Sequence, residues 1–264
     1  MTVLLIGAGR MGGALLQGWR TAGALPFDQL LIRCPSANAA VEAATAAGAC
    51  FNPPDRDLAA AQTVVLAVKP QKWREVAAAY APLLSPEAVI VSVLVGVRAA
   101  DLAAGFGGRR IARAMPTTGV ALAQGVAALH AGDAEALARA HALFDPVATA
   151  VALPSEDLMD AAAATSGSAP AYLYAFVDAL AAAGASAGLP PAAADRLARA
   201  TVVSAAAMLE ATGAEPMELR RQVASPGGST EAALRVLMGE GGLEPLLREA
   251  VAAAVRRAQE LSQA

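Results

Sequence analysis

The chain has 264 residues, of which 56% are hydrophobic and 16% are charged, and its formal net charge is −3. This length predicts two modest domains with a sizeable hydrophobic core. The weakly acidic balance argues against nucleic acid and against an acidic membrane surface as partners.

Residues 1–153 alternate short apolar runs, typical of strands, with helical stretches. Strands are expected at Val3–Ile6, Leu30–Arg33, Thr63–Val68, Ala88–Val93, Arg110–Ala114, 125–130 and 149–153, and helices near 10–22, 37–47, 71–81, 98–104 and 133–144. This alternation predicts a Rossmann-type α/β domain, a doubly wound parallel sheet with helices on both faces. The apolar run at 88–97 is ten residues long, which suits a buried strand and is too short to span a membrane.

Residues 154–264 show no strand pattern and are expected to form an all-α domain. Helices are expected at 156–165, 168–187, 191–211, 215–223, 229–239 and 244–261. No Phe, Trp or Tyr follows Phe176, so each helix buries little area. Because a helical domain of this kind is marginal alone, we expect it to pack against a copy of itself in a homodimer or a larger assembly.

The chain opens with "VLLIGAGRMGGALLQGW", in which three glycines form G-x-G-x-x-G between a strand and a helix. Gly7 permits the tight turn, Gly9 lets the backbone approach a pyrophosphate, and Gly12 lets the helix pack closely on the strand. The helix N-terminus attracts the phosphate charge. Because the following βα units are also present, the motif predicts dinucleotide binding, with a merely structural turn as the alternative.

The second and fourth strands add candidate coenzyme contacts. "QLLIRCPSAN" carries Arg33 and Ser36 and no acid after Asp28, a combination that suits a ribose 2′-phosphate and therefore NADPH over NADH. "TVVLAVKPQKW" ends with Lys69, at the strand end that faces the ligand crevice in an open α/β sheet. An ordinary solvated arginine and a surface lysine are the alternatives.

Two hydroxyl-rich segments lie in the second half. In "ASPGGSTEAALRVL", at 224–237, a proline and two glycines precede a helix that opens with Ser229 and Thr230. The backbone N–H groups of such a loop, together with the helix N-terminus, form an anion site that suits a carboxylate. In "ATSGSAPAY", at 164–172, Ser168 is expected to be a helix N-cap. Helix capping alone is the alternative for both segments.

Five segments together resemble the pyrroline-5-carboxylate reductase family. They are "IGAGRMGGAL", "VVLAVKPQ", "IARAMPTT", "ATSGSAPAYLYAFVDAL" and "VASPGGSTEAAL", in that order over nearly the whole chain. The resemblance implies a Rossmann domain at 1–153, a helical dimerisation and substrate domain at 154–264, and NADPH-dependent reduction of a cyclic imine carboxylate to L-proline, with NADH as a possible coenzyme. It also implies an active site between two subunits and, in some members, rings of dimers.

The resemblance also implies the site residues. The coenzyme would be held by Gly7, Ala8, Gly9, Arg10, Met11, Gly12, Arg33, Ser36, Asn52, Ala67, Val68, Lys69, Pro70 and Gly96, with Asn52 near the adenosine ribose. The substrate would be held by Ser225, Gly227, Gly228, Ser229 and Thr230, with the Thr230 hydroxyl at the ring nitrogen as the catalytic group.

Two segments depart from the family pattern. The family usually has M-P-N-T-P where this chain has "MPTTG" at 115–119, and S-G-S-G-P-A where this chain has "SGSAPA" at 166–171. If the glycine replaced by Ala169 requires a positive φ, the alanine strains the turn. These departures bear on substrate range and turnover more than on coenzyme binding.

Reducing a ring C=N bond takes a hydride on carbon and a proton on nitrogen. A nicotinamide coenzyme carries the hydride, and an imine nitrogen is basic enough to arrive protonated or nearly so, which leaves the protein mainly to orient the ring. The chemistry therefore needs no Ser-His-Asp set, paired carboxylates or metal ligands, and the sequence shows no such pattern.

Rival functions differ in how far the sequence excludes them. A reductase of a related cyclic imine carboxylate and a non-catalytic NADP-binding oligomer stay open. A β-hydroxyacid dehydrogenase, which by resemblance uses a lysine in its helical domain, is disfavoured because no lysine follows Lys72.

Two observations point to the cytoplasm. "MTVLLIGAGR" has no basic stretch before its apolar run, so no signal peptide is expected. Cys34 and Cys50 fit neither a disulfide scaffold nor a zinc site, and we expect ordinary thiols in a reducing compartment.

Overall fold

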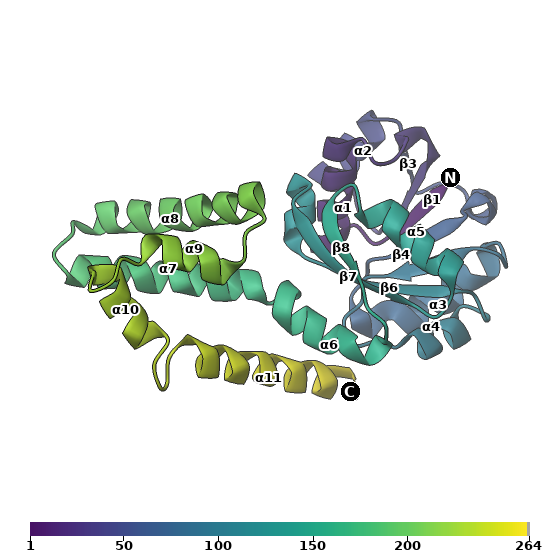
Figure 1. The fold of residues 1–264 in the computed structure, drawn as a ribbon. Coiled ribbons are helices and arrows are strands. Elements are labelled where there is room, and N and C mark those ends of the chain that lie inside the picture. Colours follow the sequence, from purple (N-terminus) through teal and green to yellow (C-terminus); the bar gives the residue numbers. More distant parts are fainter. Residues whose placement is uncertain (263–264) are drawn as a thin grey trace. The chain divides into compact units, whose positions relative to one another are not determined.

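The computed structural model describes residues 1–262 (Figure 1). The chain divides into two compact units: unit 1 is Met1–Gly167 with the carboxyl-terminal segment from Val255, and unit 2 is Ser168–Ala254. The division falls later than the expected boundary between 153 and 154. The physical reason is Met159, which is fully buried against Met115 and Ala128 of the sheet.

Unit 1 is built on an eight-stranded sheet in the order β3-β2-β1-β4-β5-β6-β7-β8. The strands are β1 Val3–Ile6, β2 Leu30–Arg33, β3 Cys50–Phe51, β4 Thr63–Leu66, β5 Val89–Ser92, β6 Ile111–Pro116, β7 Gly125–Ala131 and β8 Ala148–Ala152. The expected doubly wound α/β class is confirmed. The sheet is not wholly parallel, however, because β7 runs antiparallel to β6. A short 3₁₀ turn, Thr118–Leu122, joins these two strands, and a connection this short can join only antiparallel neighbours.

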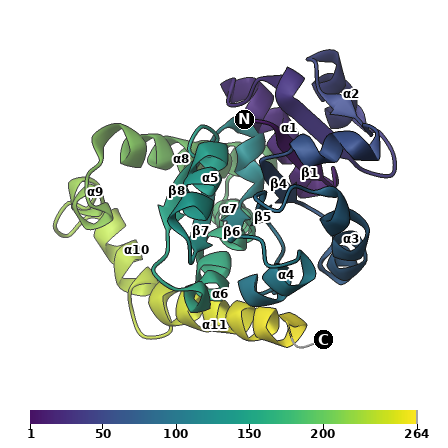
Figure 2. The ribbon, with the colours of Figure 1, turned by 90° about the vertical axis from the view of Figure 1, so that its right-hand side faces the viewer.

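Helices cover both faces of the sheet (Figures 1 and 2). They are α1 Arg10–Ala22, α2 Ala39–Ala46, α3 Trp73–Tyr80, α4 Ala99–Gly105 and α5 Ala134–Phe144, with a 3₁₀ helix, η2, at Asp55–Ala60. Successive residues of β1 point into opposite cores: Val3 and Leu5 into one, Leu4 and Ile6 into the other. This is the pattern of a strand buried on both faces, which reads in the sequence as a continuous apolar run.

Each core of unit 1 contains one of the two tryptophans. Trp19 of α1 is fully buried, and its indole N–H donates to the carbonyl oxygen of Leu143 at 2.9 Å. Trp73 opens α3 and packs into the core on the other face. The tryptophans therefore fix α1 and α3 to the sheet from opposite sides.

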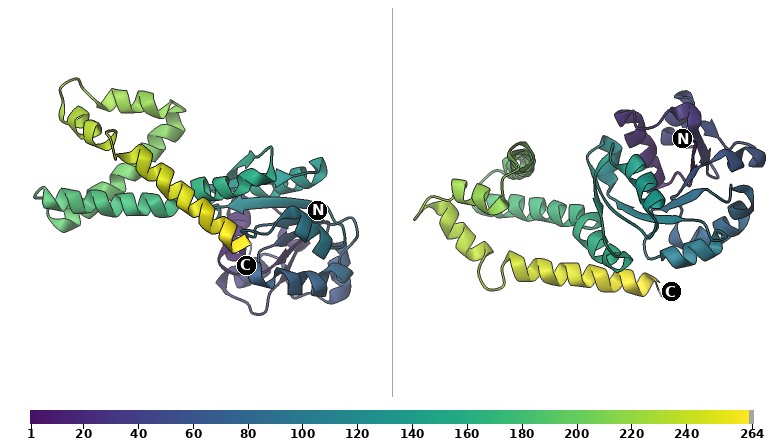
Figure 3. Two further views of the ribbon diagram at one scale, coloured as in Figure 1. Left: turned by 90° about the horizontal axis from the view of Figure 1, so that it is seen from below. Right: turned by 45° about the vertical axis from the view of Figure 1, so that its right-hand side comes forward.

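The sheet is followed by a series of helices. They are α6 Met159–Ala162, a π-helical segment at Ala163–Gly167, α7 Ala169–Ser186, α8 Pro191–Thr212, α9 Pro216–Val223, α10 Ser229–Leu237 and α11 Leu243–Ser262. Figure 3 shows α11 as one long, uninterrupted helix. None of the helices formed by residues 1–262 is long and apolar enough to cross a membrane.

Unit 2 has little core of its own. Helices α7 and α8 pack against each other, yet the buried hydrophobic residues within Ser168–Ala254 are Val177, Ala194 and Ala198 alone among the described residues. Large apolar side chains are instead open to solvent, with Tyr174 68%, Val203 70% and Val236 76% exposed. This accords with the expectation that these helices need a further packing partner.

The start of α7 differs from the expectation in one respect. Ser168 precedes the helix, but its side chain makes no capping hydrogen bond and its backbone is already helical, at φ −88° and ψ −25°. Ser168 therefore occupies the expected N-cap position but its side chain does not cap the helix, because α7 continues from the π-helical segment. Ala169 is not strained, since the residues with positive φ other than glycine in the described chain are Asn52 and Ala123.

Candidate functional site

The glycine turn lies at the carboxyl end of β1. Gly7 has φ +95°, and a Cβ there would lie 2.5 Å from the carbonyl oxygen of Ala67. A Cβ on Gly12 would lie 2.1 Å from the carbonyl oxygen of Gly7, whereas a Cβ on Gly9 would have no described atom within 4 Å. The turn and the close helix packing are therefore as predicted. The open side at Gly9 leaves room for a ligand at the N-terminus of α1, whose first turn carries no acidic residue.

Beside this turn, the ends of β2 and β3 are held together by an asparagine. The Asn52 amide donates to the Cys34 carbonyl at 3.1 Å and accepts from the Cys34 N–H at 3.3 Å. Both amide groups are thus used within the protein, and Asn52 itself has φ 48°. Two neighbouring residues differ in their surroundings. Ser36 is exposed to solvent. The Cys34 thiol is partly buried, and this burial raises its pKa.

Arg33, at the end of β2, is not free. Its guanidinium pairs with the Asp55 carboxylate, and its Cζ lies 6.0 Å from the centre of the Tyr80 ring. Its side chain is 17% exposed, and its buried Nε atom has no partner among the described residues. The alternative of an ordinary solvated arginine is therefore wrong.

The loops after β4 and β5 lie at the same edge of the sheet as the glycine turn. Ala67 and Val68 are half-buried, and Lys69 is exposed at the start of a 3₁₀ turn that begins with Pro70. Gly96, after β5, has φ +75°. Strands β1–β5 are mutually parallel, so their carboxyl ends, and with them the coenzyme residues expected from the sequence, lie along one edge.

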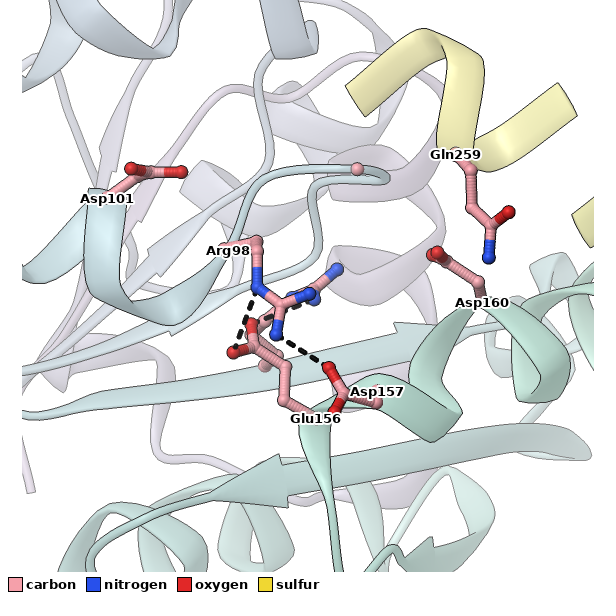
Figure 4. Close-up of a pocket in the computed structure, with 8 residues that line it drawn as sticks. Arg98, Asp101, Glu156, Asp157, Asp160 and Gln259 are labelled. Atoms are coloured by element: carbon pink, nitrogen blue, oxygen red, sulfur yellow. Dashed lines mark hydrogen bonds and ion pairs between the residues drawn. The ribbon is translucent and has the colours of Figure 1, made fainter. Parts of the chain in front are cut away.

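A charged cluster lines a cavity of about 430 Å³ next to Gly96 (Figure 4). Glu156 accepts from the Ala99 N–H at 2.7 Å and from Arg113 Nη1 at 2.9 Å. Arg98 pairs with Asp157 at 2.7 Å, and this hydrogen bond, followed by the charge of Glu156, raises the pKa of the Arg98 guanidinium. Arg113 is 3% exposed, and among the described residues Glu156 is the acid that forms an ion pair with it. The cluster ties residues 156–157 to the loop that carries Gly96.

The loop at 225–230 belongs to unit 2. Gly227 has φ +72°, the Gly228 N–H donates to the Ser225 carbonyl at 2.9 Å, and Thr230 is half-buried in the first turn of α10. The first-turn N–H groups of a helix have no intrahelical acceptor, as the anion site requires. The Gly227 N–H, however, donates to the Glu231 carboxylate at 2.6 Å. One donor of the loop is therefore already used by a carboxylate of the protein.

No metal cluster is formed by the part of the chain that the structure describes: no group of three or more His, Cys, Asp or Glu side chains is placed to hold an ion. The candidate residues fall into two regions: the strand-end edge of unit 1, where the coenzyme contacts are expected, and the first turn of α10 in unit 2, where the carboxylate contacts are expected.

Known proteins match this chain over its whole length. It is 37% identical to a pyrroline-5-carboxylate reductase of Pseudomonas aeruginosa over 266 aligned residues, which cover 99% of this chain and 97% of that protein. The chain belongs to the pyrroline-5-carboxylate reductase family. A reductase of this family from Pisum sativum is 35% identical, with 99% and 96% of the two chains covered.

Comparison by domain and by structure agrees with this membership. Residues 156–261 match the family described as pyrroline-5-carboxylate reductase dimerisation, and residues 2–96 match the family described as NADP oxidoreductase coenzyme F420-dependent. The structure of a pyrroline-5-carboxylate reductase from Coxiella burnetii has a TM-score of 0.90 at 31% identity and covers 98% of each chain. A pyrroline carboxylate reductase of Plasmodium falciparum, solved with NADP bound, shares the fold at 23% identity and a TM-score of 0.82, with 99% of this chain and 98% of that chain covered.

The departure of this reductase-family chain at 115–119 is accommodated locally. Thr117, where the family usually has asparagine, is buried, and its hydroxyl accepts from the Val126 N–H at 3.0 Å. A Cβ on Gly119, where the family usually has proline, would lie 2.8 Å from the Gln124 carbonyl oxygen. The turn at residue 119 therefore has no room for a side chain, and glycine fits it.

Sequence reasoning missed three polar residues around the site. Asn38 caps α2 and also donates to the Ala8 carbonyl at 2.7 Å; an asparagine before an apolar helix was the available signal. Asp55 and Glu156 contact arginines 22 and 43 residues away in the chain. No local pattern in the sequence indicates such pairs.

Proposed function

We propose that this chain reduces 1-pyrroline-5-carboxylate to L-proline, the last step of proline biosynthesis, with NADPH as the preferred coenzyme and NADH as a second one. The observation that carries the proposal is the 37% identity to a curated pyrroline-5-carboxylate reductase over 99% of the chain. The glycine turn and the "SPGGST" loop, both present in full, support it.

The residues on the coenzyme edge suit a dinucleotide. We infer that the pyrophosphate lies on the open side of Gly9, where the N–H groups of α1 face it. Arg33 and Ser36 would meet the 2′-phosphate, Asn52 would shape the adenosine end through its bonds to Cys34, and Ala67–Pro70 with Gly96 would border the rest. A bound NADPH supplies the hydride.

The unit 2 loop suits the substrate carboxylate. We infer that Ser225, Gly227, Gly228 and Ser229 surround the carboxylate and that the Thr230 hydroxyl hydrogen-bonds to the ring nitrogen. Among residues 1–262, no protein group accepts a hydrogen bond from that hydroxyl, so it is available to a ligand. The loop then fixes the ring, and the proton on nitrogen needs no strong acid beside it.

We also propose that residues 154–264 form the dimerisation and substrate domain, as a homodimer or a ring of dimers. The exposed apolar side chains of unit 2, such as those of Tyr174, Val203 and Val236, support this. Light scattering should find no stable, active monomer at micromolar concentration.

We place the reaction in the cytoplasm, a reducing compartment, since Cys34 and Cys50 are both unpaired.

The decisive experiment is an NADPH oxidation assay with pyrroline-5-carboxylate, a six-membered analogue and 1-pyrroline, which lacks the carboxylate. We expect pyrroline-5-carboxylate to react fastest and 1-pyrroline to be a poor substrate. Thr230→Val, which keeps the volume and removes the hydroxyl, should lower kcat/KM by the equivalent of about 1–3 kcal/mol while leaving NADPH affinity unchanged. NADPH binding without turnover of any of these imines would instead indicate a non-catalytic oligomer.

A further inference from the structure

An acidic side chain lies where the second strand ends, although the sequence places none there. Asp55 opens η2 and pairs with Arg33, the last residue of β2. In Rossmann domains an acid at this place accepts from the ribose 2′-hydroxyl of NAD, and an arginine accommodates the 2′-phosphate of NADP. Here both groups occur and are bound to each other.

The pair is held in place by its surroundings. Asn52 fixes the chain before Asp55 by its two side-chain bonds to Cys34, and its own N–H donates to the Ile32 carbonyl at 2.8 Å. The Arg33 side chain is 17% exposed and that of Asp55 is 67% exposed. The carboxylate is therefore the more accessible partner, open to solvent at the coenzyme edge.

We propose that Asp55 sets the coenzyme preference of this chain. Its carboxylate neutralises Arg33 and opposes a 2′-phosphate. NADH therefore competes with NADPH better than it would if Arg33 were unpaired. The inference rests on the proposed coenzyme site. A 2′-phosphate brings up to two negative charges to an ion pair whose net charge is zero, whereas a 2′-hydroxyl donates to the free lone pairs of the Asp55 carboxylate.

If Asp55 has only a structural role, its replacement should change the preference for NADPH in the opposite direction. If the carboxylate only holds Arg33 in position, its removal lets the arginine leave the site, and NADPH binding weakens. If the carboxylate opposes the phosphate, its removal strengthens NADPH binding relative to NADH. The direction of the change in the ratio of the two affinities separates these roles.

The test is calorimetric titration of the full-length protein with NADPH and with NADH, without substrate. Asp55→Asn keeps the shape and removes the charge. Asp57→Asn is the matched control, since Asp57 lies on the same short helix and pairs with Arg56 at 3.6 Å instead. We expect Asp55→Asn to raise the preference for NADPH about two- to fivefold, as for one charge in an exposed ion pair. Asp57→Asn should leave it unchanged, and the gain should shrink at high salt.

An unchanged or lowered preference in Asp55→Asn, with thermal stability retained, would overturn the role of Asp55 and leave the proposed reaction standing. Failure of the unmodified protein to bind either coenzyme would overturn both. A second variant, Arg33→Asp, should change the preference in the opposite direction. It should lower the preference for NADPH about ten- to a hundredfold, as expected for loss of a charge-assisted contact.

Discussion

Replacing Glu156 by glutamine should destabilise unit 1 more than its modest change in shape suggests. Glu156 bonds to the Ala99 N–H and to Arg113, which is 3% exposed and already has two side-chain nitrogens without partners in the described chain. Glutamine keeps one acceptor oxygen but removes the charge, so the buried guanidinium loses its counterion. Breaking a buried pair from one side costs about 3–5 kcal/mol.

For a unit of this size, that loss corresponds to a fall in Tm of about 6–20 °C. Urea unfolding, followed by far-ultraviolet circular dichroism at fixed protomer concentration, measures the loss in the free energy of unfolding. Asp157→Asn is the control, because Asp157 and its partner Arg98 are 74% and 57% exposed and such a pair is worth about 0–1 kcal/mol. Arg113→Met added to Glu156→Gln should recover most of the loss. Equal stabilities of Glu156→Gln and Asp157→Asn would refute the reasoning.

Three further outcomes are expected. Gly12→Ala should abolish coenzyme binding, because its Cβ would lie 2.1 Å from a carbonyl oxygen. Gly13→Ala is the control and should bind the coenzyme normally, since its Cβ would lie 3.6 Å from the nearest atom. If titration finds that both variants bind, the turn can widen to accept a side chain. Glu231→Gln should lower KM for pyrroline-5-carboxylate about two- to fivefold, since it removes a like charge from the loop; a raised KM would mean that the charge holds the loop. Iodoacetamide should alkylate exposed Cys50 before Cys34, whose pKa is raised by burial, and mass spectrometry after brief labelling would contradict this if Cys34 reacted first.

The elements that could be predicted from the sequence are those with a long or repetitive pattern. β1 is wholly apolar and β2 is apolar except for its last residue, Arg33, and the bounds of both agree with the structure residue by residue. β3 was missed because two residues, Cys50–Phe51, carry no periodicity. The direction of β7 was missed because strand hydropathy is the same in either direction, and the length of the preceding turn is what decides it.

The site was predictable to the extent that backbone geometry carries it. Glycines at 7 and 12 are required by a turn and a close approach, and a glycine-specific position is visible in the sequence. The partners of Arg33 and Arg113 were not predictable, because ion pairs form between side chains that only the folded sheet brings together. The same holds for Glu231, whose bond to Gly227 uses a donor that the sequence alone assigned to a ligand.

The placement of both tryptophans in unit 1 makes this chain spectroscopically asymmetric. Trp19 and Trp73 lie in the two cores around the sheet, and Ser168–Ala254 contains none. Indole emission therefore reports the cores of unit 1 alone. Dissociation or melting confined to the helices of unit 2 would be nearly silent in that signal. Comparing emission with a whole-chain measure of helix content would thus resolve the order in which the two units lose structure.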